Sequence, residues 1–150
     1  MPAAFIRPYD DADFGYVCRM NTRVHNEPYA GAVFIRQAGV LYPESFFVLE
    51  GTQGVMGFTI AAQVQGRPSE GWILRLHVAE ECRRSGYGRL LLRASVRSLA
   101  VSGVRLVFLS VAPGNTAAIE LYTSEGFIPV LKKDSYFGRG EDRLIMEKSV

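Results

Sequence analysis

The sequence contains few of the residues from which metal centres and disulfide frameworks are built. Among its 150 residues there are two cysteines, Cys18 and Cys82, which are far apart and form no C-x-x-C pair. Neither a zinc site nor a disulfide framework is expected, so we predict no bound metal and a reducing, cytoplasmic compartment. The 17 basic and 15 acidic residues leave a net charge of +2, which is too small to indicate a nucleic-acid partner.

Long apolar runs are also missing from the sequence. No run approaches the roughly 20 residues that span a bilayer, and the segment MPAAFIRPYDDADF lacks the basic, apolar and small-residue succession of a signal peptide. We therefore expect no membrane association. The chain is 48% hydrophobic and 21% charged, which is enough apolar material for the core of one domain over residues 1–150.

The first half of the chain predicts mainly strands. The acidic residues in 10–13 suit the first turn of a helix, on which Phe14, Val17 and Cys18 share one face. The runs SFFVLEG and GVMGFTIAAQV, rich in Phe, Val and Ile, predict a hairpin. The expected strands are 4–9, 45–51, 54–64 and 72–79, with a second helix within 29–39 and a loop at 65–71.

The second half predicts helices that alternate with strands. A helix that begins at Gly86 carries Arg89, Arg93 and Arg97 on a face that we expect to be solvated. The almost continuous apolar run at 104–112 is typical of a strand buried on both faces beside a parallel neighbour. The remaining elements are a helix from 115 to 126 and strands at 127–133 and 142–148, separated by a loop at 134–141.

The segment CRRSGYGRLLL joins an apolar strand to the start of a helix, an arrangement that suits phosphate. Unpaired backbone N–H groups gather at such a turn, and Gly86 and Gly88 let the backbone approach an anion closely. Arg83, Arg84 and Arg89 add positive charge. A dinucleotide fingerprint would need a third glycine and a nucleotide P-loop would need G-K-[ST], and both are absent. The loop by itself fits equally well a glycine turn with surface arginines.

The motifs around this loop resemble those of the GNAT superfamily of acyl-CoA-dependent N-acyltransferases. The match consists of R-x-x-G-x-G between a strand and a helix, followed about 30 residues later by NTAAIELYTSEGF. The resemblance implies an α/β fold with a mixed, mostly antiparallel sheet of about seven strands, about four flanking helices and a central parallel βαβ unit.

The same resemblance implies acetyl-CoA as cosubstrate and assigns its contacts. Backbone groups of Leu76 and Val78 would meet the pantetheine, the loop would hold the pyrophosphate, and Tyr122 would protonate the departing thiolate. The implied cofactor residues are Leu76, Val78, Arg83, Arg84, Ser85, Gly86, Tyr87, Gly88, Arg89 and Asn115.

Three further stretches, NEPYAG, YPESFFVLEG and DSYFGRGEDRLIMEK, are similar to protein N-terminal α-amino acetyltransferases, including the ribosomal-protein type. In that group an acidic residue after the first helix and a tyrosine pair before G-E-D embrace the peptide terminus. The implied acceptor residues here are Glu27, Tyr29, Tyr136 and Phe137. The sequence departs from the group at Phe137, which lacks one hydroxyl, and at Ser110, where several relatives carry a glutamate or histidine base.

The chemistry itself requires a neutral amine. An α-amine with a pKa near 7.7 to 8.0 is roughly one-tenth neutral at pH 7, whereas a lysine near 10.4 is neutral in fewer than about one molecule in a thousand. Without a strong base at Ser110, the proton would pass to water or Glu27, with His77 in reserve. Each candidate has a plainer interpretation: Glu27 as a surface acid, His77 as a structural residue of its strand, and Tyr122 as a packed helix aromatic.

Three functions fit these observations. The first is acetylation of a protein or peptide N-terminus. The second is acetylation of a small amine such as an amino acid, polyamine or aminoglycoside. The third is a non-catalytic acyl-CoA-binding module. We expect a monomer or homodimer with no nucleic-acid or membrane partner.

Overall fold

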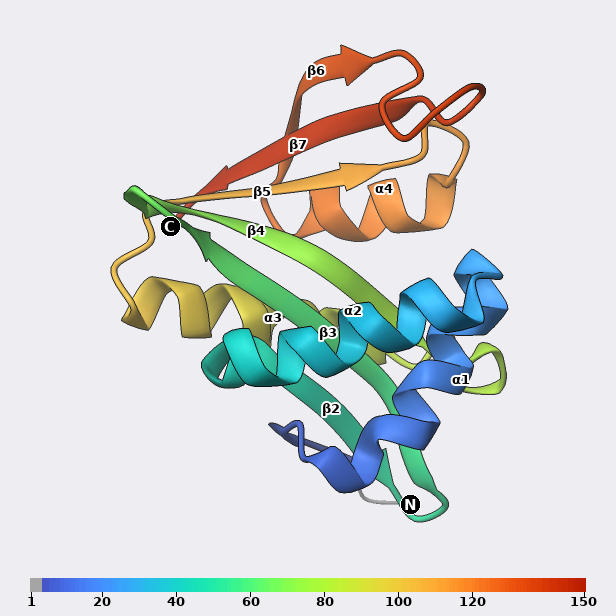
Figure 1. Cartoon of the computed structure of the whole chain (residues 1–150). Coiled ribbons are helices and arrows are strands. Elements are labelled where there is room, and N and C mark those ends of the chain that lie inside the picture. The colour runs from blue at the N-terminus through green and yellow to red at the C-terminus, as the bar shows by residue number, and fades with distance from the viewer. Residues whose placement is uncertain (1–3) are drawn as a thin grey trace.

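The computed structural model describes residues 4–150, apart from the side chain of His25, and contains one seven-stranded sheet with helices on both faces (Figure 1). The strand order is β1-β2-β3-β4-β5-β7-β6, in which β4 and β5 are parallel and the other neighbours antiparallel. The strands are β1 Phe5–Pro8, β2 Phe46–Gly51, β3 Gly54–Val64, β4 Arg67–Val78, β5 Leu106–Val111, β6 Ile128–Lys133 and β7 Arg143–Ser149. The helices are α1 Phe14–His25, α2 Pro28–Leu41, α3 Tyr87–Val101 and α4 Thr116–Ser124, with 3-10 turns η1 Asp11–Asp13, η2 Pro43–Ser45 and η3 Glu80–Cys82.

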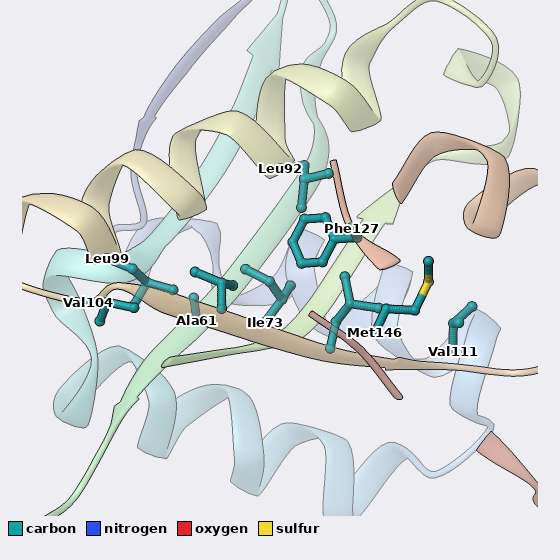
Figure 2. Close-up of a cluster of buried hydrophobic side chains, with 10 residues drawn as sticks. Ala61, Ile73, Leu92, Leu99, Val104, Val111, Phe127 and Met146 are labelled. Carbon is teal, nitrogen blue, oxygen red and sulfur yellow. The ribbon is translucent and has the colours of Figure 1, made fainter. Parts of the chain in front are cut away.

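Two hydrophobic clusters, one on each face, hold the helices to the sheet. Beneath α1 and α2, Val17 and Ile35 pack with Phe46 and Phe58 of the first hairpin. On the opposite face, α3 and α4 pack over β3, β4, β5 and β7, and Figure 2 shows Phe127 beside Leu92 in this cluster. The predicted helix end at Gly126 explains that contact, because the chain turns there and Phe127 N–H donates to the Tyr122 carbonyl at 3.0 Å.

The beginning of the first helix follows the acidic cluster, as predicted. Asp10 caps η1 by accepting a hydrogen bond from Ala12 N–H, and η1 continues directly into α1. Asp13 is buried and lies 2.8 Å from the Arg7 guanidinium, which ties β1 to the start of the helix. In the described part of the chain no helix is both long and apolar enough to cross a membrane.

Two expectations about strands were wrong. The loop predicted at 65–71 is instead a tight turn at 65–66, and β4 already begins at Arg67, because a two-residue hairpin turn lets pairing resume at once. The strand expected at 104–112 is not buried on both faces. In β5 the buried residues alternate with partly exposed ones, since α3 and α4 cover one face while the other opens beside β4.

Candidate active site

The site is built on a separation between β4 and β5. These strands pair over three residues, from Glu70 opposite Leu106 to Trp72 opposite Phe108, and beyond that point they diverge (Figure 1). The rings of Trp72 and Phe108 stack at 5.3 Å between centroids where the pairing ends. Both strands continue past this aromatic pair, so their carboxyl ends border a wedge-shaped opening in the sheet.

A β-bulge in β4 turns its backbone toward this opening. Ile60 pairs with Arg75 and Ala61 with Ile73, so Leu74 is the extra residue. Ala79 N–H donates to the Met56 carbonyl of β3 at 2.7 Å. Backbone groups in an antiparallel strand point alternately toward and away from the neighbour, so those of Leu76 and Val78 face away from β3. This places them at the edge of the opening, where the resemblance assigned contacts to pantetheine amides.

The loop after β4 has the backbone that an anion site requires. Arg84 and Gly86 have positive φ angles of 65° and 79°, and Gly86 caps α3 without any side-chain hydrogen bond to the first turn. The N–H groups of Tyr87, Gly88 and Arg89 therefore have no partner within the helix, and together with the helix dipole they favour phosphate. The loop's donor set thus fits the pyrophosphate of coenzyme A, and exposed Ser85 adds a hydroxyl.

The arginine side chains at the loop differ in their exposure and in their hydrogen-bond partners. Arg83 and Arg84 are exposed, and Arg83 Nε donates to the Val78 carbonyl at 3.2 Å. Arg89 instead lies against α4, with Nη1 2.6 Å from Glu125 and 2.9 Å from the Ser124 hydroxyl. In this structure Arg89 is therefore engaged by α4 and not directed into the loop.

The arginine face of α3 is largely solvated, as expected, with Arg93 and Arg97 exposed and Arg89 partly exposed. Arg93 Nε also binds Glu125, at 2.7 Å. Hydrogen bonds from Arg93 and Arg89 lower the pKa of Glu125 to about 2, against the opposing effect of desolvation. Glu125 thereby joins the end of α4 to α3. The sequence analysis missed this role because the partners are more than 30 residues apart, as with Arg93 and Glu125.

Asn115 and Tyr122 sit on α4, on the β5 side of the opening. Asn115 caps the helix by accepting a hydrogen bond from Ala118 N–H at 3.2 Å, which leaves its amide nitrogen as a donor. Tyr122 packs against the α3/α4 cluster, with its ring 6.0 Å from that of Phe127. Burial raises the pKa of Tyr122 to about 12, so its hydroxyl is protonated at neutral pH and can donate a hydrogen bond or a proton. Among the described residues this hydroxyl has no hydrogen-bond partner.

The predicted acceptor residues lie in two segments at one end of the molecule, the α1–α2 junction with the first turn of α2 and the β6–β7 loop. Glu27 and Tyr29 occupy the sharp junction of α1 and α2, where Tyr29 is 84% exposed. Tyr136 and Phe137 project from the β6–β7 loop, with ring centroids 4.9 Å apart and the Arg143 guanidinium over Phe137. Figure 1 shows both segments on the same side as the carboxyl ends of β4 and β5. The α1–α2 junction lies on the face of the sheet that α1 and α2 cover, which we call the acceptor face.

The structure also settles which face His77 occupies. Its ring meets Phe58 edge-on at 5.2 Å, within the cluster beneath α1 and α2. It lines a hollow of about 320 Å³ between α1 and the end of β4, with Arg23 and Glu80 at the rim. His77 is therefore on the α1/α2 face, which is the acceptor face. Ser110 is on the same face, because buried Leu109 and Val111, its neighbours in β5, point to the other one.

One charged residue at the opening was overlooked in the sequence. Arg75 stands alone within the apolar strand segment WILRLHV, which is the signal that identifies it. Its Nε donates to Asn21 Oδ1 of α1 at 3.3 Å, and its guanidinium lies over Phe34 of α2, 4.6 Å from the ring centroid.

Comparison with known proteins agrees with this architecture. The model of the acetyltransferase (GNAT) family matches residues 9–127. An N-alpha-acetyltransferase of Sulfurisphaera tokodaii is 32% identical over 115 residues, covering 70% of this chain and 69% of that protein. The [ribosomal protein bS18]-alanine N-acetyltransferase of Escherichia coli K12 is 29% identical and covers 94% of both chains. The crystal structure of Ard1 from Thermoplasma volcanium has a TM-score of 0.89 at 28% identity, covering 99% of this chain and 98% of that one.

These matches confirm the predicted fold class and the predicted enzyme class with its cosubstrate, an acetyl-CoA-dependent N-acetyltransferase. The separated β4 and β5, the uncapped loop before α3 and the family match over residues 9–127 lead to one conclusion: this chain belongs to the acetyltransferase (GNAT) family.

Proposed function

We propose that this protein transfers the acetyl group of acetyl-CoA to the N-terminal α-amine of a protein or peptide. The observation that carries the proposal is the position of two exposed segments on the side where the carboxyl ends of β4 and β5 separate. One is the α1–α2 junction with Glu27 and Tyr29, and the other is the β6–β7 loop with Tyr136 and Phe137. Relatives of this chain at 32% and 29% identity are named for N-terminal acetylation. An extended peptide end between two such segments can form backbone contacts that a free amino acid lacks.

Acetyl-CoA, when bound, supplies an activated thioester. The residues of the chain then have three tasks. The amides at 86–89 and the exposed Arg83 and Arg84 bind the pyrophosphate, and the outward backbone of Leu76 and Val78 aligns the pantetheine. Tyr122 donates a hydrogen bond to the departing sulfur, a role for which its protonated state suits it.

The third task is to hold an amine that is already partly neutral. Ser110 faces the acceptor side and cannot accept a proton usefully, so the enzyme depends on an acceptor of low pKa. The neutral fraction of an α-amine at pH 7 exceeds that of a lysine by roughly 200- to 400-fold. Glu27, at the α1–α2 junction, and His77, on the same face, are the candidates to receive the proton.

The test uses two peptides whose sequences differ only at one internal position and at the N-terminal group. The first has a free N-terminus and no lysine, and the second has a blocked N-terminus and one internal lysine. Mass spectrometry should find acetyl transfer to the first and little to the second. The variants Glu27→Gln and, as a matched control on exposed η2, Glu44→Gln should differ, with only the former slowing transfer. Preference for the lysine peptide, or for free polyamines over both peptides, would refute the proposal.

A further inference from the structure

Arg75 is a partly buried cation whose recorded partners are all neutral. It donates to Asn21 Oδ1 at 3.3 Å and to the Leu74 carbonyl at 2.9 Å, and it stacks on Phe34. No carboxylate lies within ion-pair distance in the described part of the chain. Other arginines of the structure differ in this respect: Arg7, Arg89 and Arg93 each bind a carboxylate at 2.8 Å or less.

Without a bound ligand, this arrangement of Arg75 lowers the stability of the folded protein. Taking a guanidinium out of water without an anion carries a desolvation penalty, and burial accordingly lowers the pKa of Arg75. A guanidinium has five N–H donors, and two hydrogen bonds use two of them, which leaves three. A carboxylate supplied by a ligand would offset this penalty through charge-assisted hydrogen bonds to the remaining donors.

The bulge in β4 determines on which face of the sheet the Arg75 guanidinium and its remaining N–H donors lie. Ile73 and Leu76 pack toward α3 and α4, whereas Leu74 packs beneath α1 and α2. Arg75 contacts α1 and α2 as well, so Leu74 and Arg75, although consecutive, share one face. Because β4 and β5 separate after Trp72, Arg75 borders the opening on one side and Ser110 borders it on the other, both on the acceptor face.

We propose that Arg75 binds a carboxylate of the acceptor and makes the enzyme selective for acidic N-termini. Arg75 adjoins Leu76, whose backbone faces the opening, so the carboxylate belongs to the first or second residue of the peptide. A planar guanidinium backed by an aromatic ring presents its free edge to a carboxylate in the paired geometry that arginine favours. This inference rests on the proposed function, since it names the acceptor of the same site.

The experiment compares peptides that differ in one residue. A parent peptide carries aspartate or asparagine at position 1, and a second pair carries the same two residues at position 2. For the wild type, kcat/KM should favour the aspartate peptide by about 10- to 150-fold in one of the two pairs, as one charge-assisted hydrogen bond allows. In Arg75→Met this ratio should fall to within about twofold of unity, and Arg75→Lys should retain part of it. The control Arg97→Met, on the outer face of α3, should keep the wild-type ratio.

The outcomes separate this inference from the proposed function. Transfer to N-termini without any preference for aspartate, or a preference that survives in Arg75→Met, would overturn the role of Arg75 and leave the proposed function intact. If no peptide is acetylated but small amines are, the proposed function fails, and the ratio between an amino acid and its amide then decides the role of Arg75. Thermal unfolding of Arg75→Met is measured alongside. If this variant does not fold, the wild-type and Arg75→Lys ratios decide the question.

Discussion

Removal of a single hydroxyl, in Tyr122→Phe, tests the chemistry of the site most directly. The ring would keep its contact with Phe127, and the hydroxyl that is lost has no hydrogen-bond partner among the described residues. The variant should therefore fold normally, with a change in the free energy of unfolding within about 0.5 kcal/mol. Any large loss of activity is then a loss in the chemical step.

The expected magnitude follows from the raised pKa of this residue. Burial raises the pKa of Tyr122 to about 12. A thiol has an ordinary pKa near 8.5, so complete proton transfer from tyrosine to a free thiolate would be unfavourable by roughly 3.5 pKa units, or about 5 kcal/mol. Tyr122 contributes chiefly as a hydrogen-bond donor to developing charge, which is worth about 1.5–3 kcal/mol. The variant should accordingly lose about 10- to 150-fold in kcat, near the lower end of general acid catalysis.

The assay is single-turnover transfer to a free-N-terminus peptide at saturating acetyl-CoA, so that chemistry limits the rate. The KM for acetyl-CoA should stay nearly unchanged, and circular dichroism should match the wild type. Since Tyr122 remains protonated up to about pH 12, wild-type kcat should show no loss that depends on this residue between pH 7 and 10. An unchanged kcat in Tyr122→Phe, or a descending limb near pH 9 that the variant abolishes, would refute this reasoning.

Two further predictions concern the phosphate loop and the ion pairs between α3 and the end of α4. A Cβ at Gly88 would lie 3.4 Å from Leu121 and 3.9 Å from Val78, so Gly88→Ala should fold and bind acetyl-CoA. The larger side chain of Gly88→Val should fill the space between β4 and α4. In calorimetric titration this variant should bind acetyl-CoA at least about tenfold more weakly than the wild type. Arg89→Ala, which leaves the loop amides in place, should have the smaller effect, and tight binding by Gly88→Val would contradict the loop assignment. Glu125→Gln should lower the free energy of unfolding on the order of 1 kcal/mol at neutral pH. The pKa of Glu125 in the folded protein is about 2, below the ordinary value of 4.5. The difference in unfolding free energy between wild type and variant should therefore be complete above pH 4.5 and vanish as the pH falls through 2. A difference in urea unfolding that stays constant with pH would count against the ion pairs.

Local patterns in the sequence were sufficient to predict most of the fold and the glycine-containing turn between β4 and α3. Alternating apolar residues, the acidic start of α1, the cap at Asn115 and the turn at Gly126 depend on neighbours within a few residues, so each could be predicted from a short segment. The same holds for the glycine-containing loop before α3, where the left-handed Gly86 and the uncapped amides belong to one stretch of chain. The order of these elements and two motifs then sufficed to predict the family.

Tertiary structure alone decided what the site presents to its ligands. The Leu74 bulge arises from register with β3, and it determines both that Leu76 and Val78 face the opening and that Arg75 points toward α1 and α2. The pairing of Arg89 with Glu125 joins residues 36 positions apart, so two arginines of a solvated helix face also connect α3 to the end of α4. Such features depend on strand register and on contacts between distant segments, and a one-residue shift in register would reverse them. The sequence therefore determined which groups are available for acetyl transfer, and only packing determined which of them meet.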